Sequence, residues 1–451
     1  GGRIAIDRAA TTYSVDVRCN QAPLPVPIRI ASSPIPIKLG TPYYTYAVNS
    51  GSRDNTLSVI KTTDSLPGVV ARLPLNSPSI DVAVSPDGTL AFVTSLGNAS
   101  AISADGTPAP IAPNIEVFDT IALTPIDMDA KTTGIQPIRL PLGAQPFSIA
   151  ISPDGKTGFA SDRNRPVVYR FSADPKSFGF GSVTVVDLLG PSGLAPSDLK
   201  GFTGIDFSPD GWQLWIASPG KRSWAGGDFH VGAPGFLLSF DLFTGKVSTL
   251  DSFDLDGDPD TPAVPLGEKP FGVTRSPVGN AVAVAVRASE AAGVMFVDAR
   301  TQRITDVMAT NLRGYEANLL LERNALLGQL TRNDFVPFFQ DRGGKDRSLQ
   351  PASLFDINYA ESITFTRDGK YAFVLFNNTY DPSNASTDPE LGGGGNIGII
   401  ENPLTNPKFV AATRQVPFSF PNEVAVDSTN RFLIASFTGT NDVRAYDIFK
   451  I

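Results

Sequence analysis

A short polar turn between two apolar runs recurs along the chain, and this repeat constrains the fold more than any other feature. Three copies read Ser-Pro-Asp-Gly, and two further copies keep part of that pattern. Proline presets the backbone at the first central position, aspartate bonds back to the main chain and glycine accepts a left-handed conformation. The apolar runs on both sides predict a strand before and after every turn. The turns begin at Ser85, Ser152, Ser208, Ser276 and Thr366.

The spacing of the turns indicates a repeated unit of about 45 residues that carries insertions of variable length. Two degenerate turns, at 321–324 and 427–430, fit the same frame. A third strand, often ending in aspartate, and a shorter fourth strand follow each hairpin. Four strands per unit, repeated around a ring, predict an all-β fold, a single β-propeller of four-stranded blades. The sequence favours eight blades, and seven is the alternative if 313–360 is an insertion with a helical stretch.

The N-terminal region is expected to close the ring. Residues 46–64 match the second and third strands of a further unit, and residues 27–33 match its first strand. The last unit lacks a fourth strand, and residues 12–18 are expected to supply it, which removes an open sheet edge. We therefore divide the chain into an N-terminal extension with the closing strand, residues 1–26, and a β-propeller, residues 27–451.

The residues around the turns resemble the YVTN-type β-propeller repeat of cell-surface repeat proteins and lactonase-like propellers. The shared phrase runs Pro-Phe-x-x-Ala-x-Ser-Pro-Asp-Gly, followed by an aromatic residue and valine, and then by Asn-x-Val-x-Val-Asp in the third strand. The resemblance covers most of the chain and implies the propeller fold. It is nearly silent on activity, because propellers host unrelated functions.

Charge and cysteine content narrow the classes of protein. A net charge of -8 without a basic cluster argues against a nucleic-acid partner, and no apolar run approaches the roughly 20 residues that span a bilayer. Cys19 is the only cysteine, so no internal disulfide can form. The chain begins without methionine, so we expect a removed leader, and Asn98, Asn377 and Asn384 stand in glycosylation sequons. Together these features predict an extracellular or cell-surface protein.

The long segments are expected to gather on one face of the ring. Because the chain reverses at each strand, second-to-third loops share a face with the connections between blades, and the short turns lie on the other face. Long loops on a repeat scaffold are the usual place for recognition, and inert tolerated insertions are the alternative. The segments of this kind are 96–114, 219–235, 251–270 and 377–395, with 341–357 as an exception on the other face.

One of these segments contains four closely spaced aspartates. Carboxylates this close repel one another unless a cation lies among them, and Ca²⁺ prefers oxygen ligands on a flexible loop. We expect a structural calcium ion there, with a solvated acidic loop as the alternative. Because His230 is the only histidine, metal sites built on His/Cys clusters are excluded. The metal ligands predicted are Asp254, Asp256, Asp258 and Asp260.

Polar residues also stand near the start of the inner strands, where they are expected to face the central channel. Carboxylates and an amide that converge there could hold Ca²⁺ and activate water, as in gluconolactonase-type propellers. A water-filled channel also favours polar residues without any catalysis. The candidates are Asp81, Glu316, Glu361, Asn422 and Glu423.

The sequence favours a non-catalytic extracellular propeller that serves cell-surface structure or recognises a protein or surface ligand on the long-loop face. Self-assembly, or a place in a larger assembly, is a further expectation. The alternative is a calcium-dependent, lactonase-like hydrolase with its site at the channel mouth. No nucleic-acid partner and no membrane span are expected.

Overall fold

The structure is a computed structural model, and it describes most of the chain from residue 44 onward. The fold of these residues is all-β, with one short helix, α1 (Leu189–Ser192), and one 3-10 turn, η2 (Ile448–Lys450). The described segments are 44–50, 55–62, 67–101, 106–129, 131–219, 221–225, 228–233, 235–250, 252–253, 264–265, 270–286, 293–309, 360–377, 394–413, 416–417, 421–437 and 442–450.

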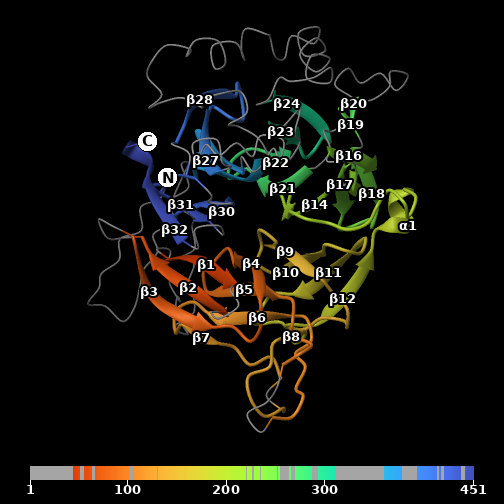
Figure 1. The fold of residues 1–451 in the computed structure, drawn as a ribbon, viewed down its shortest axis with the longest axis vertical. Coiled ribbons are helices and arrows are strands. Elements are labelled where there is room, and N and C mark those ends of the chain that lie inside the picture. The colour runs from red at the N-terminus through yellow and green to blue at the C-terminus, as the bar shows by residue number, and fades with distance from the viewer. Residues whose placement is uncertain are drawn as a thin grey trace, which may run out of the picture. The chain divides into compact units, whose positions relative to one another are not determined.

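Seven antiparallel sheets are arranged around a central axis as the blades of a single β-propeller (Figure 1). We number the blades 1 to 7 in chain order. Blades 1 to 3 contain β1 (Tyr44–Ser50), β2 (Asn55–Lys61) and β3 (Gly68–Pro74); β4 (Ser79–Val84), β5 (Leu90–Ser95), β6 (Asn114–Asp119), β7 (Thr124–Pro125) and β8 (Ile138–Arg139); and β9 (Pro146–Ile151), β10 (Thr157–Asp162), β11 (Val167–Ser172) and β12 (Val183–Asp187).

Blades 4 to 7 complete the described ring. Blades 4 and 5 contain β13 (Ile205–Phe207), β14 (Gln213–Ser218), β17 (Phe236–Asp241) and β18 (Val247–Leu250); and β21 (Pro270–Arg275), β22 (Ala281–Val286), β23 (Gly293–Asp298) and β24 (Arg303–Ala309). Blades 6 and 7 contain β25 (Ala360–Phe365), β26 (Tyr371–Asn377), β27 (Gly394–Glu401), β28 (Lys408–Ala412) and β29 (Val416–Pro417); and β30 (Pro421–Val426), β31 (Phe432–Phe437) and β32 (Asp442–Asp447).

The Ser-Pro-Asp-Gly turns form the tight hairpins that the sequence predicts. In blade 2, the Ser85 hydroxyl donates to Asp87 Oδ1 at 2.6 Å and accepts the N–H of Leu90 at 2.9 Å. Gly88 has a φ of 72°, which explains why glycine stands there. Ser152 and Ser208 bond to the turn aspartates of blades 3 and 4 in the same way. Turn chemistry thus fixes the first hairpin of these blades.

The favoured count of eight blades is wrong, and the alternative of seven is confirmed. The eighth blade was expected around the degenerate turn at 321–324, between blades 5 and 6. Instead, β21 and β25 are direct neighbours, and Thr274 Oγ1 donates to the carbonyl of Ile363 at 2.7 Å. Residues 310–359 lie outside the described residues. The turn at 321–324 fitted the frame by spacing alone, because it lacks the proline and glycine that define such a hairpin.

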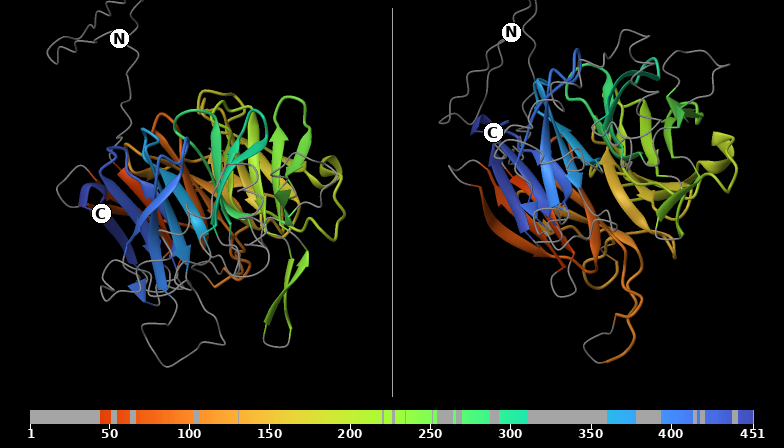
Figure 2. Two further views of the ribbon diagram at one scale, coloured as in Figure 1. Left: turned by 90° about the horizontal axis from the view of Figure 1, so that it is seen from above. Right: turned by 45° about the horizontal axis from the view of Figure 1, so that its top comes forward.

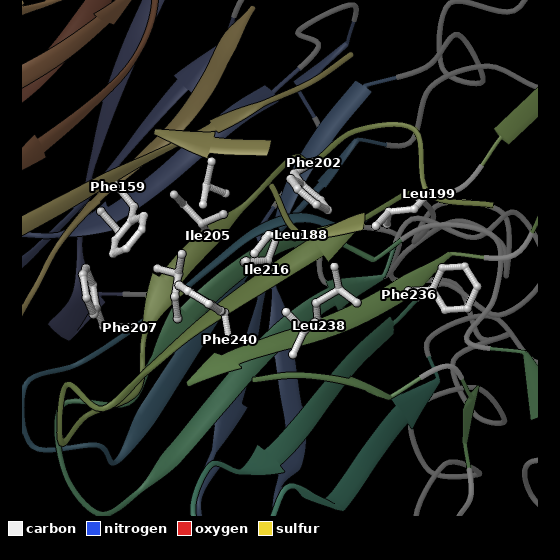
Figure 3. Packing of buried hydrophobic residues seen from close by; sticks show 14 residues of the cluster. Phe159, Leu188, Leu199, Phe202, Ile205, Phe207, Ile216, Phe236, Leu238 and Phe240 are labelled. Carbon is white, nitrogen blue, oxygen red and sulfur yellow. The ribbon is translucent and has the colours of Figure 1, made fainter. Parts of the chain in front are cut away.

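The hydrophobic core lies between neighbouring blades. Between blades 3 and 4, the ring of Phe159 packs against Phe207, with centroids 5.8 Å apart, and edge-on against Phe240, at 6.4 Å (Figure 3). Phe159 and Phe207 are fully buried. Burying such a side chain contributes roughly 1.5–3 kcal/mol, so each blade is stabilised mainly by the faces of its neighbours.

Blades 1 and 7 differ from the others at their edges. In blades 2, 3, 4, 5 and 7, the second strand has no more than one residue that is not buried. In β1 only Ala47 is buried, although β1 lies beside β4 as β5 lies beside β9. By position β1 is therefore a second strand, and among the described residues blade 1 has no innermost strand and blade 7 no outermost one. The segments expected there, 27–33 and 12–18, lie outside the described residues.

Candidate functional site

The axis of the ring holds a cavity of about 130 Å³ that all seven blades line. Part of its wall is aromatic, because Phe147 and Phe271 meet edge to face with their centroids 5.7 Å apart. Other parts of the wall carry carboxylates and an amide. The polar residues predicted from the sequence that line this cavity are Asp81, Glu361, Asn422 and Glu423. Glu316, the remaining candidate, lies outside the described residues.

These residues meet because the inner strands repeat one pattern. Asp81 and Glu423 both stand four residues before the first residue of the following turn. In blades 4 and 5 the same position is Gly204 and Gly272. A Cβ atom at Gly204 would clash with the carbonyl oxygen of Phe271, and one at Gly272 with that of Glu361. Glycine is needed there because the inner strands of blades 4, 5 and 6 approach backbone to backbone.

Asp81 joins two blades. Its Oδ2 accepts the backbone N–H of Ile149 in blade 3 at 2.9 Å, and its Oδ1 accepts the N–H of Val82 at 2.7 Å. Burial raises the pKa of Asp81 to about 6, the two hydrogen bonds oppose that shift, and the charge of Asp206 adds to it. The geometry is that of a structural acid that bridges neighbouring inner strands.

Glu423 lies in the same cavity on the first strand of blade 7. Its Oε1 accepts the hydroxyl of Ser362 in blade 6 at 2.5 Å. The side chain still reaches channel solvent, but loss of hydration among the surrounding strands raises its pKa to about 8. The charges of Asp81 and Glu361 add to this shift. The carboxylates therefore interact with one another, and the described structure disfavours their simultaneous ionisation.

Sequence reasoning missed an ion pair beside the channel. Asp206 Oδ2 accepts the backbone N–H of Arg275 at 2.9 Å, and Arg275 Nη1 lies 3.4 Å from Asp206 Oδ1. The same guanidinium donates to the carbonyl of Ile151 at 3.0 Å. Burial raises the pKa of Asp206, and Arg275 opposes the shift. The sequence does show an aspartate two residues before Ser208, at an inward position of the strand. It could not show the partner of this aspartate, because Arg275 belongs to the next blade.

Two further buried acids hold the connections that lead into inner strands. Glu116 accepts the backbone N–H of Asn76 at 2.9 Å and the hydroxyl of Ser95 at 3.1 Å. Asp162 accepts the N–H of Gln145 at 3.0 Å, just before blade 3 begins. Burial raises the pKa of Glu116 to about 7. Both acids have a structural explanation that needs no ligand.

In the part of the chain that the structure describes, no group of three or more His, Cys, Asp or Glu residues is arranged to hold a metal ion. His230 belongs to β16, whose side chains are not described. The aspartates predicted to bind calcium, Asp254, Asp256, Asp258 and Asp260, lie outside the described residues, and their role remains a prediction.

Extra elements leave the ring on one face. The ends of second and fourth strands share a face because those strands run parallel. The hairpin of β15 (Lys221–Ala225) and β16 (Asp228–Ala233) follows a second strand and projects away from the blades (Figure 2). The pair β19 (Ser252–Phe253) and β20 (Val264–Pro265) follows a fourth strand, and an isolated bridge joins Asn98 to Ile111 after β5. We call this side the long-loop face.

The other face carries the short turns. Trp212, directly after the turn of blade 4, and Phe243, in the next turn of that blade, are 65% and 87% exposed. No helix among the described residues combines the length and the apolar character needed to cross a membrane.

Comparison with solved structures identifies similar propellers. The β-propeller domain of Cps50 (Swd1) from Myceliophteria thermophila has a TM-score of 0.51 and 10% identity over 91% of this chain and 95% of that chain. A protein from Lactobacillus plantarum has a TM-score of 0.50 and 12% identity over 90% of each chain. At such identities the similarity shows the propeller fold alone. No family model matches the sequence, and no curated protein matches it.

Proposed function

We propose that the protein is a non-catalytic recognition propeller of the YVTN type, which acts outside the cell and binds a protein or other surface ligand through its long-loop face. The observation that carries the proposal is the uneven placement of the extra elements. The β15–β16 hairpin, the β19–β20 pair and the Asn98–Ile111 bridge all extend connections on that face. Long connections on a repeat scaffold are where binding surfaces arise.

The hydrogen bonds of the channel acids support a structural role for these residues over a catalytic one. Asp81 and Asp206 accept backbone N–H groups of neighbouring blades, and Glu423 accepts the hydroxyl of Ser362. A general acid or base must instead present its carboxyl group to a substrate. Holding the inner strands together explains why these acids stand there.

Two features support the proposed location. Asn98, in a glycosylation sequon, is exposed on the long-loop face, and its Oδ1 accepts the N–H of Ser100 at 3.0 Å. The aspartate-rich segment 254–260 stands in the chain between β19 and β20, and Ca²⁺ bound by it would have a structural role. Self-assembly through this face is part of the proposal.

The test compares the purified protein with two variants for saturable binding to the outer surface of the producing cells. One variant replaces residues 222–232 by a short glycine linker, and the control changes Trp212→Ser and Phe243→Ser on the other face. We expect the first change to abolish binding and the control to retain it. Sedimentation at rising protein concentration measures self-assembly of the same samples.

A lactone-hydrolysis assay with and without chelator tests the alternative, a calcium-dependent hydrolase at the channel mouth. We expect no turnover above the uncatalysed rate. Turnover that disappears in Asp81→Asn and Glu423→Gln would overturn the proposal.

A further inference from the structure

Three buried oxygen atoms near the seam between blades 1 and 2 have no hydrogen-bond partner among the described residues. They are Asn55 Oδ1 on β2, Ser77 Oγ in the connection from β3 to β4, and Asn114 Oδ1 on β6. Ser77 is 1% exposed and Asn114 is 2% exposed. Asn114 Nδ2 donates to the carbonyl of Ala112 at 2.8 Å, which fixes the other end of this amide as the acceptor. Buried acceptors of this kind call for an explanation, and a bound ion is one.

The three oxygens belong to segments that lie together. The carbonyl of Asn55 accepts the N–H of Leu75 at 2.9 Å, and the N–H of Asn76 donates to Glu116 Oε1 at 2.9 Å. Glu116 stands two residues after Asn114 on β6, so both side chains are on the same face of blade 2. The connection from blade 1 to blade 2 therefore runs past both strands that carry the other two oxygens.

That face of blade 2 is turned toward blade 1. Phe118, two residues after Glu116, belongs to an apolar cluster with Leu57 and Val59 of blade 1. Asn55, two residues before Leu57, faces the same seam from the other side. The chain enters β2, β4 and β6 at the long-loop face, so the oxygens lie at that end of the apolar seam.

The hydroxyl groups beside these oxygens are short of one positive charge. Ser79 Oγ lies 3.0 Å from the carbonyl oxygen of Ser77 and 2.5 Å from Ser95 Oγ, which lies 3.1 Å from Glu116 Oε1. Three contacts join these oxygens, but while Glu116 is ionised the two serines supply only two protons. One more positive charge, a proton or a cation, is needed to hold them together.

We propose that Asn55, Ser77, Asn114 and Glu116 hold a monovalent metal cation, sodium or potassium, through the three oxygens named above and the carboxylate. A proton on Glu116 would complete the serine contacts but leave those oxygens as they are. A water molecule would pair with the oxygens but supply no charge. A cation does both, and hard cations take oxygen ligands of this kind.

The charge of the group selects the valence of the ion. Glu116 is the only charged residue of the four, so a monovalent ion leaves the group neutral. A divalent ion would leave one positive charge uncompensated in a buried place, which is costly. The hydrogen bonds of Glu116 to Asn76 and Ser95 account for the acid itself, whereas the ion accounts for the oxygens beside it. The inference is independent of the proposed function, because it concerns how two blades are joined.

The test measures the thermal unfolding midpoint of the full chain at constant ionic strength and at pH 8, above the pKa of about 7 that burial gives Glu116. It compares the chlorides of sodium, potassium and N-methylglucamine, an organic cation too bulky for a buried site. We expect sodium or potassium to raise the midpoint saturably relative to N-methylglucamine, as any ligand does that binds the folded state alone. Equal midpoints in the three salts would mean ordered water only and overturn the inference.

Two variants locate the ion. Glu116→Gln removes the charge but keeps an acceptor for the N–H of Asn76, so it should lose the response to sodium and potassium. Ser77→Ala removes one ligand and should need more salt for half the effect, which gives a second readout if the first variant folds poorly. Asp162→Asn is the matched control, because Asp162 is another buried acid that accepts a backbone N–H before a blade begins, and it should keep the full response. A response that survives in Glu116→Gln would overturn the inference.

Calcium is tested in a chain that carries Asp256→Asn and Asp258→Asn, so that the predicted loop site does not contribute. At the same ionic strength, calcium chloride should not replace sodium or potassium chloride. A calcium response that Glu116→Gln removes would show a divalent site and overturn the monovalent assignment.

Discussion

The carboxylate of Asp81 on β4 accepts the backbone N–H of Ile149 on β9 at 2.9 Å, so a side chain of one blade completes the hydrogen bonding of the next. Asp81→Ala should leave that N–H without its acceptor and destabilise the fold by roughly 1–3 kcal/mol. Asp81→Asn keeps an acceptor oxygen and should lose less. Urea unfolding of both variants measures the difference, and equal losses would mean that the hydrogen bond contributes little.

Gly204 allows the inner strands of blades 4 and 5 to approach closely. Gly204→Ala should destabilise the protein by roughly 1–3 kcal/mol, because the new methyl group meets the carbonyl oxygen of Phe271 and the strands must separate. Gly68→Ala is the matched control, since no atom lies within 4 Å of the position that its methyl group would take. Thermal unfolding of the two variants should differ clearly; equal midpoints would contradict the close approach.

Glu116 should make stability depend on pH. Burial raises its pKa from the ordinary 4.5 to about 7, so between these values the folded chain holds a proton that the unfolded chain has released. The stabilisation is complete below about pH 4.5 and is lost as the pH rises through about 7, by on the order of 3 kcal/mol.

Glu116→Gln cannot titrate at this site and keeps an oxygen for the N–H of Asn76. Its unfolding free energy should therefore fall less between pH 5 and pH 8 than that of the wild type. Parallel pH profiles would show that Glu116 ionises normally in the folded protein.

Calcium should stabilise the protein if segment 254–260 binds it. Any ion that binds the folded state alone raises stability with its concentration, by about 2.7 kcal/mol at a hundred times the dissociation constant. The unfolding temperature should rise on adding Ca²⁺ and fall again with chelator, and the combined change Asp256→Asn and Asp258→Asn should abolish the response. A calcium response that survives this change would place the ion elsewhere.

Local chemistry explains which parts of the fold could be predicted. The turn at Ser85-Pro86-Asp87-Gly88 encodes its own geometry, because all its hydrogen bonds lie within a few residues. The channel positions of Asp81 and Glu423 followed from their place near the start of the inner strands in the repeat frame. The blade count did not follow, because the turn at 321–324 shared the spacing without the chemistry, and only the contact of β21 with β25 decides between seven and eight blades.

The site was less predictable for a related reason. The pairing of Asp206 with Arg275 joins residues 69 positions apart, on strands whose lateral order no local pattern specifies. The pKa shifts at Asp81 and Glu423 likewise arise from charges on separate blades. Residue types indicated a polar channel, but their partners became visible only in the assembled ring.

The four apolar side chains Ala47, Ile60, Phe432 and Ile434 form the described packing cluster between blades 7 and 1. At Gly204 and Gly272, by contrast, main chains press directly on main chains. Because no side chain separates the main chains at these two glycines, the spacing of the inner strands of blades 4, 5 and 6 cannot be adjusted by a change of rotamer. A larger residue at either position should therefore displace whole blades and be felt across the central channel.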